Sequence, residues 1–134
     1  MQHFLPGKSC KMEKQFMKSS NYLLECCVDS AYSARMAKKG GADRLELCSN
    51  LVIGGTTPTL ALYEQIRNQT DIRIHVLIRP RFGDFLYSED ETALICKEID
   101  AFRAAGADGV VIGSLSPDGS LCTEQLKRFR EHAR

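Results

Sequence analysis

The chain has 134 residues, with 18 Lys and Arg against 17 Asp and Glu, and its formal net charge is +1. This balance argues against a nucleic-acid-binding module, which would carry a clustered basic excess. Hydrophobic residues make up 43% and charged residues 26%, the composition of a folded protein. No apolar run approaches the roughly 20 residues that span a bilayer. We therefore expect a folded protein that binds neither nucleic acid nor a membrane.

The first 22 residues differ from the rest of the chain. They contain four lysines and a single acid, Glu13, and they have neither an apolar core nor a small-residue cleavage pattern. This composition is poor for a signal peptide and predicts a disordered basic tail over 1–22. Without an export signal we expect a reducing, cytoplasmic location, where the six cysteines are free thiols.

From residue 23 onward, short apolar runs alternate with helical patterns. The runs predict four strands, at 23–28, 44–48, 72–78 and 109–115. Asp29 or Ser30 should cap a first helix that ends at Gly40-Gly41, and Thr57 and Pro58 should begin a second. Ser88 with Glu91 forms a capping-box pattern for a third helix, and a fourth should begin at Thr123.

This succession is four βα units, which implies a parallel sheet with helices packed outside it. An internal echo supports the same fold class. The sequence Gly-Ala-Asp precedes both the second strand, at 41–43, and the fourth strand, at 106–108. Such an echo is typical of folds built from repeating βα pairs and says nothing about function.

Side-chain alternation along the strands gives the clearest functional signal. One face of each strand is apolar, whereas the other carries polar and ionisable groups. We expect these groups to pair with one another or to line a wet cavity near the carboxyl ends of the strands, because an unpaired buried charge is costly. A buried ion network and a ligand pocket are the two alternatives. The residues on this second face are Glu25, Cys27, Arg44, Glu46, Cys48, His75 and Arg79.

Two loops add candidates. Gly54, Gly55, Thr56 and Thr57 bring flexible backbone to a predicted helix N-terminus, which indicates either an anion-binding loop or a tight turn. The loop from Arg79 to Phe85 follows a strand directly and concentrates Arg79, Arg81, Asp84 and two phenylalanines. A simple solvated turn would have little use for both aromatic rings.

With these residues in view, the sequence from about Leu23 to the end resembles the CutC family, which is named for copper homeostasis. The stretch Ile78–Ser88 is the most specific part of the match. The other matching segments are 25–30, 41–48, 54–58, 106–109 and 117–119. The amino-acid sequence at 27–30 and 86–87 is most similar to that of animal members of the family.

The resemblance implies a TIM-type (βα) barrel, of which residues 23–134 would supply the first four βα units, a half barrel. It also implies a cytoplasmic and nuclear protein linked to copper. The family cysteines proposed for copper match Cys27 and Cys48, and the family's pocket residues match Glu25, Arg44, Glu46, Arg79, Arg81 and Asp84. Cu(I) is soft and prefers thiolates, so copper is the expected metal.

Length bears on this expectation, because a complete eight-unit barrel needs roughly 200–250 residues. We expect a truncated isoform, or a homo-oligomer that closes the half barrel. The leading hypothesis for its function is copper binding in homeostasis. A second is a TIM-barrel enzyme that acts on a small anionic or carbonyl substrate, with Glu25 or Glu46 as acid or base and Arg79 and Arg81 as anion clamps. A third is a product without activity of its own.

Overall fold

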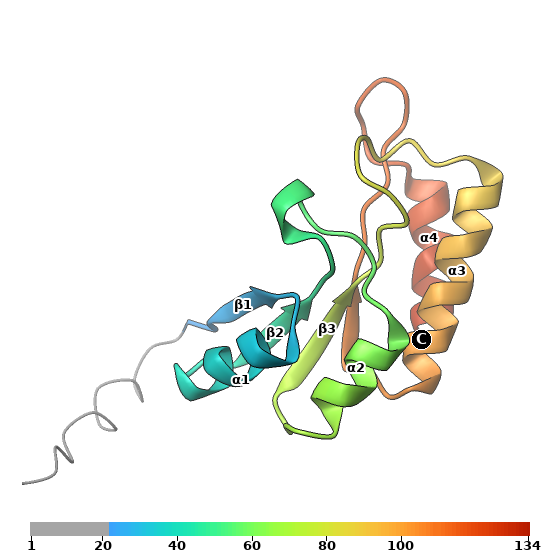
Figure 1. Cartoon of the computed structure of the whole chain (residues 1–134). Coiled ribbons are helices and arrows are strands. Elements are labelled where there is room, and N and C mark those ends of the chain that lie inside the picture. The colour runs from blue at the N-terminus through green and yellow to red at the C-terminus, as the bar shows by residue number, and fades with distance from the viewer. Residues whose placement is uncertain (1–21) are drawn as a thin grey trace, which may run out of the picture.

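A computed structural model describes residues 22–134, so all but the last residue of the expected 1–22 tail lies outside the described residues. Strands and helices alternate along the chain, as Figure 1 shows. In order they are β1 (Glu25–Val28), α1 (Ala31–Lys39), β2 (Arg44–Leu47), the 3-10 turn η1 (Leu51–Ile53), α2 (Leu60–Arg67), β3 (Arg73–Leu77), α3 (Glu89–Ala104), β4 (Gly109–Val111) and α4 (Thr123–Ala133).

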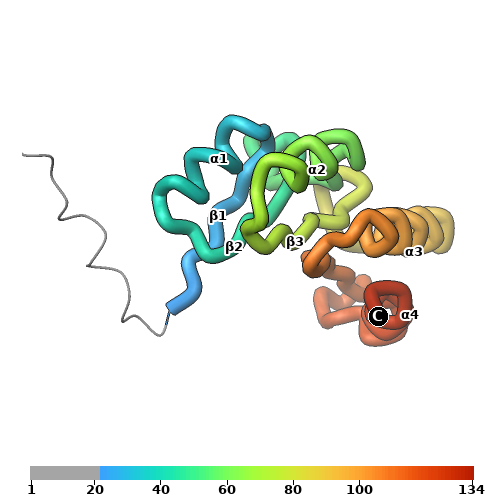
Figure 2. The backbone as a smooth tube through the Cα atoms, turned by 90° about the horizontal axis from the view of Figure 1, so that it is seen from below, coloured from blue at the N-terminus to red at the C-terminus, as the bar shows by residue number. Residues whose placement is uncertain are grey.

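The four strands form one parallel sheet in the order β1-β2-β3-β4. Viewed from below, the four helices of the described part of the chain all lie on the outer side of the curved sheet and leave its inner side uncovered (Figure 2). This arrangement is a partial α/β barrel and confirms the predicted fold class. Among residues 22–134, no helix has both the length and the apolar character needed to cross a membrane.

The core lies between the sheet and its helices. Every second residue of the central strands is fully buried there, as the alternation predicts; these residues include Leu45, Leu47, Ile74, Val76 and Ile78. The helices contribute Tyr63 and Ile66 from α2, Ile95, Ile99 and Phe102 from α3, and Phe129 from α4. Because the apolar residues are used on this side, the polar residues of the strands line the inner, concave side.

Local sequence signals fix most of the helix starts. Ser30 caps α1 and Ser88 caps α3, and Ser88 forms the predicted capping box with Glu91. The prediction that Thr57 and Pro58 begin α2 is wrong, because Thr59 is the cap and the helix begins at Leu60. Thr57 instead bonds to a neighbouring loop: its N–H donates to the Arg79 carbonyl, and its hydroxyl accepts the Arg79 N–H, both at 2.9 Å.

The repeated Gly-Ala-Asp sequence has one structural role in both copies. The Asp43 carboxylate accepts the Leu24 N–H at 2.8 Å, and the Asp108 carboxylate accepts the Ile74 N–H at 2.9 Å. Each aspartate thus ties the start of an even-numbered strand to the preceding odd-numbered one. The repeated Gly-Ala-Asp sequence therefore serves strand pairing, in agreement with its interpretation as a feature of the fold.

The fourth strand is shorter than the predicted 109–115. After Val111 the chain leaves the sheet, and the Leu115 N–H donates to the Phe85 carbonyl at 3.0 Å. The buried Ser114 hydroxyl bonds to Gln125 of α4. These contacts replace sheet pairing with a link between the β3–α3 loop and α4.

The loop between β2 and α2 depends on two glycines with positive φ, Gly54 at 87° and Gly55 at 83°. Gly55 is buried, and a Cβ at this position would lie 2.8 Å from Cδ2 of Leu77 and 3.6 Å from Sγ of Cys48. Glycine is therefore required at 55 both for its backbone angle and for the close approach of the loop to the sheet.

We predict that Gly55→Ala destabilises the protein more than Gly119→Ala does, by about 1–3 kcal/mol, because alanine at 55 adds a steric clash to the backbone strain. Gly119 is the matched control: its φ is 82°, and a Cβ there would meet nothing within 4 Å. Urea unfolding of both variants measures the difference. Equal losses of stability would show that Leu77 moves aside without cost.

Candidate functional site

Parallel register arranges the concave face in rows. One row joins Cys27 of β1, Glu46 of β2, His75 of β3 and Gly109 of β4. Because side chains of paired residues in adjacent parallel strands lie side by side, this row places a thiol, a carboxylate and an imidazole on one surface. The structure thus brings together three residues that the alternation pattern had selected.

Both candidate copper ligands hydrogen-bond to Glu46. The Cys27 thiol donates to the Glu46 carboxylate, with Sγ 3.3 Å from Oε2. The Cys48 thiol lies 3.7 Å from the Glu46 backbone carbonyl and also donates to it. Cys27 is exposed, whereas Cys48 is only 1% exposed and lies beneath Gly55. Glu46 therefore contacts an accessible thiol through its carboxylate and a buried thiol through its backbone carbonyl.

Both thiols are held in the protonated form. Burial raises the pKa of Cys27 to about 11, and the hydrogen bond and negative charge of Glu46 contribute further. Burial raises the pKa of Cys48 to about 12, with added repulsion from Glu46 and Cys27. At neutral pH these groups are weak nucleophiles, since the thiolate is the reactive form.

Glu25 and Arg44 form an ion pair two residues before the row of Cys27 and Glu46, toward the amino ends of the strands. These residues begin β1 and β2, so the pair lies at the amino ends of the strands. The prediction that the ionisable residues gather at the carboxyl ends is therefore wrong for Glu25 and Arg44. Because Arg44 already neutralises Glu25, this carboxylate is less available to a second cation.

The imidazole of His75 covers Gly109. A Cβ at Gly109 would lie 2.9 Å from both Cδ2 and Nε2 of the ring. Burial lowers the pKa of His75, with a further contribution from the positive charge of Arg44, so the ring is neutral at physiological pH. Its contacts identify it as part of the packed surface of the concave face.

Arg79 connects the two candidate loops. It is 8% exposed, and its guanidinium donates to the carbonyls of Gly54, Gly55 and Gly83 at 3.2, 3.1 and 2.7 Å. Its Cζ also lies 4.8 Å from the centroid of the Phe85 ring. The β2–α2 and β3–α3 loops are thus held together by one buried cation.

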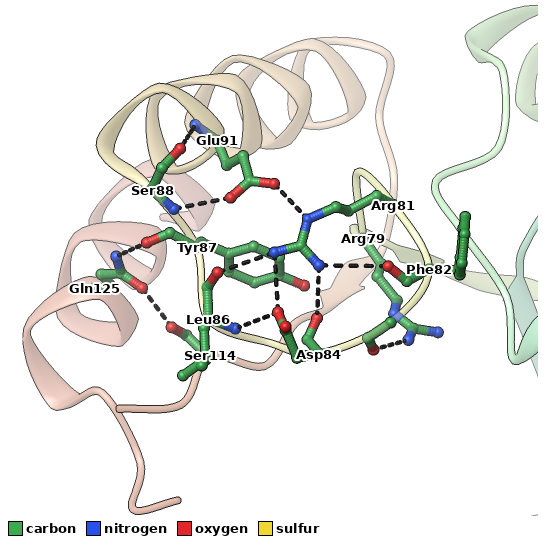
Figure 3. Close-up of polar contacts among 11 residues, drawn as sticks. Arg79, Arg81, Phe82, Asp84, Leu86, Tyr87, Ser88, Glu91, Ser114 and Gln125 are labelled. Carbon is green, nitrogen blue, oxygen red and sulfur yellow. Dashed lines mark hydrogen bonds and ion pairs between the residues drawn. The ribbon is translucent and has the colours of Figure 1, made fainter. Parts of the chain in front are cut away.

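Arg81 has an equivalent role within its own loop, as Figure 3 shows. Its guanidinium binds the carboxylate of Asp84 at 3.0 Å and that of Glu91 at 2.5 Å. It also donates to the carbonyls of Phe82, Asp84 and Leu86. All of its nitrogens bond within the loop and to the start of α3, so Arg81 and Asp84 act as a brace.

The backbone of the predicted anion-binding loop is similarly occupied. The N–H groups of Gly54, Gly55, Thr56 and Thr57 donate to carbonyls of Leu51, Asn50, Ser49 and Arg79, at 2.8–3.1 Å. An anion at this loop would have to displace these bonds. The anion-binding role of the loop and the clamp role of the two arginines stay predictions, and the observed contacts favour a structural role.

One contributor to the loop contacts escaped the sequence analysis. Glu98 of α3 is partly buried and accepts the Thr57 hydroxyl at 2.9 Å. Burial raises the pKa of this carboxyl, which the Thr57 bond partly offsets. The signal was present in the sequence: Glu98 follows Ile95 by three residues and precedes Phe102 by four, so it lies on the apolar face of its helix.

Residues 22–134 contain no group of three or more His, Cys, Asp or Glu side chains placed to hold one ion. Cys27 lies in β1 and Cys48 directly follows β2, and sulfur ligands in general suit a soft metal better than a hard one. The other described cysteines pack elsewhere: Cys26 against the core, Cys96 in α3 and Cys122 at the start of α4.

The fold and the concave face define a partial (βα) barrel with a thiol–carboxylate cluster on its inner surface. Residues 22–134 match the sequence model of the CutC family, and the chain belongs to this family. It is 41% identical over 124 residues to the mouse copper homeostasis protein cutC homolog, a match that covers 88% of this chain and 46% of the mouse protein. To the human homolog it is 45% identical over 106 residues, covering 79% of this chain and 39% of the human protein.

The fold comparison agrees with the sequence match. A crystal structure of CutC from Streptococcus agalactiae superposes with a TM-score of 0.77 at 28% identity and covers 83% of this chain and 54% of that one. The chain thus spans about half the length of the relatives that it matches.

We predict that Arg79→Lys lowers the free energy of unfolding by about 2–3 kcal/mol, because one ammonium group cannot serve three carbonyls in two loops. Arg130→Lys is the matched control, since Arg130 is exposed on α4 and makes no side-chain hydrogen bond or ion pair with described residues. Urea unfolding gives the stabilities, and hydrogen exchange should show lost protection at 50–57 and 79–87. Unchanged protection in the Arg79 variant would contradict the bridging role.

We also predict that alkylation of Cys27 is slow at neutral pH and accelerates with a midpoint near the raised pKa of about 11. Glu46→Gln should lower that pKa and speed the reaction at neutral pH, because it removes the negative charge beside the thiol. Glu64→Gln, on the exposed face of α2, is the control. Peptide mapping by mass spectrometry resolves each cysteine, and a Cys27 midpoint unaffected by Glu46→Gln would disprove the coupling.

Proposed function

We propose that this chain binds Cu(I) as cargo through the thiolates of Cys27 and Cys48. The observation that supports this most directly is that both thiols hydrogen-bond to one residue, Glu46, from neighbouring places on the concave face. The mouse and human relatives are named as copper homeostasis proteins. Cu(I) accepts two sulfur ligands and favours thiolates over oxygen donors.

Binding would exchange protons for metal. Cu(I) with two thiols would give a bis-thiolate complex and two released protons, since both groups are protonated at neutral pH. Two Cu–S bonds form and two S–H bonds break, with no change in oxidation state. The Glu46 carboxylate, already in contact with the Cys27 proton, is placed to accept it first.

The difference in burial between the two sulfurs suggests an order of events. Cys27 is exposed and Cys48 is buried beneath the loop at Gly55. The ion would bind Cys27 first and then gain Cys48 as its second ligand, and it would leave by the reverse order to a competing thiol. Such exchange needs reduced cysteines and Cu(I), so we place the protein in a reducing compartment, the cytoplasm with the nucleus.

We predict that Cys27→Ser and Cys48→Ser each weaken Cu(I) binding by at least about 100-fold, more than loss of an outer-shell partner costs a metal site. Cys122→Ser, at the start of α4, is the matched control and should bind as the unaltered chain does. Anaerobic competition against a chromogenic Cu(I) chelator measures the affinity.

The pH dependence supplies a second readout. With two protons released, the logarithm of the affinity should rise by about two per pH unit below the thiol pKa values, and by about one in either single variant. Unchanged affinity and stoichiometry in the double variant would exclude these ligands.

A further inference from the structure

Within residues 22–134, the concave face and the two edges of the sheet are open. In residues 22–134, β1 pairs with β2 only and β4 with β3 only. No helix covers the concave side in Figure 2. Open edges of a parallel sheet are unusual in soluble proteins, because they present rows of unpaired backbone groups.

The hydrogen bonds identify which groups face outward. The Val111 carbonyl accepts the Ile78 N–H of the β3 side, so Val110, one residue earlier, turns its N–H and C=O to the open edge. At the other end of the sheet, the Val28 carbonyl accepts the Cys48 N–H, so Cys27 and Glu25 turn their backbone groups outward. Each edge thus offers a short row of donors and acceptors that have no partner among residues 22–134.

Apolar surface accompanies both edges. On the helix side of β1, Leu24 is 43% exposed and Cys26 is partly exposed. On the helix side of β4, Val110 is also only partly buried, as is Ile112 just beyond the strand. In a closed barrel a helix covers each pair of adjacent strands, whereas no further strand of residues 22–134 pairs beside these residues.

We propose that two copies of this chain associate about a two-fold axis parallel to the strands, so that β4 of each copy pairs with β1 of the other. Rotation about such an axis preserves strand direction, so both new pairings are parallel like the existing ones. Two sheets of four strands give the eight strands of a closed (βα) barrel, and closure removes all the edges at once.

A second copy fits this surface in size and charge. The chain covers 54% of the Streptococcus agalactiae CutC chain, so the rest of that protein is about as large as one further copy. The strand residues of the concave face include two carboxylates, Glu25 and Glu46, and two guanidinium groups, Arg44 and Arg73. Two such faces meet without an excess of like charge.

This inference is independent of copper, although closure would place Cys27 and Cys48 inside the barrel. Sedimentation of the 134-residue chain over a dilution series tests it. We expect a reversible dimer of twice the 15.0 kDa mass of one chain. A monomer at every concentration would overturn the proposal.

Val110→Pro separates edge pairing from other modes of association. Proline removes an N–H that has no partner among residues 22–134 of the same copy, so the monomer should keep its fold, while the β4–β1 ladder of the dimer is broken. Val110→Ala, which keeps the N–H, should remain dimeric. A Val110→Pro chain that is still dimeric would show that another surface is responsible.

Hydrogen exchange of the unaltered chain gives an answer that needs no variant. The amides of Glu25, Cys27 and Val110 should be protected in the dimer and should lose protection on dilution. Fast exchange at all concentrations would contradict edge pairing. Protection that persists in a monomer would show that the edges are covered from within the same chain and would also refute the proposal.

Discussion

Parallel register between the strands is the constraint on which the concave face depends. Because Cys27 is paired with Glu46, and Glu46 with His75, a thiol, a carboxylate and an imidazole share one row. A shift of either strand by one residue would turn these groups into the core and bring Leu45 or Leu47 to the open face. The burial of the leucines under the helices therefore fixes the position of the polar row.

The loops above this row are organised by cations whose partners are mostly backbone carbonyls. Arg79 joins Gly54 and Gly55 to Gly83, and Arg81 closes its own loop through Asp84 and the start of α3 at Glu91. A buried guanidinium is stable here because its charge is spread over several dipoles and an aromatic ring. The result is a set of cross-linked loops after the carboxyl ends of β2 and β3, whose arginine donors bond to groups of the loops themselves and of the start of α3.

Features set by neighbouring residues were predictable from the sequence. The strands, the Ser30 and Ser88 caps and the buried stripe of α3 follow from alternation, capping boxes and helical spacing. The start of α2 did not, because Thr57 bonds to Arg79, 22 residues away, and a local pattern does not contain that partner. The same reason applies to the arginines: their charge suggested an external anion, whereas in the fold Arg79 bonds to carbonyls of two loops and Arg81 to carbonyls of its own loop and the carboxylates of Asp84 and Glu91.

Protonation and metal choice are linked in the proposed copper site. Raised pKa values make Cys27 and Cys48 poor ligands for any metal that does not bind sulfur strongly, since each bond must first displace a proton. Hard cations gain little, because Glu25 is already paired with Arg44 and no cluster of three oxygen, nitrogen or sulfur ligands exists among the described residues. The carboxylate of Glu46 thus acts in two ways: together with burial, the larger cause, it raises the pKa of both thiols, and it is hydrogen-bonded to Cys27 and placed to take the proton when a thiophilic ion arrives. A site of this kind selects its metal through the cost of deprotonation as much as through its geometry.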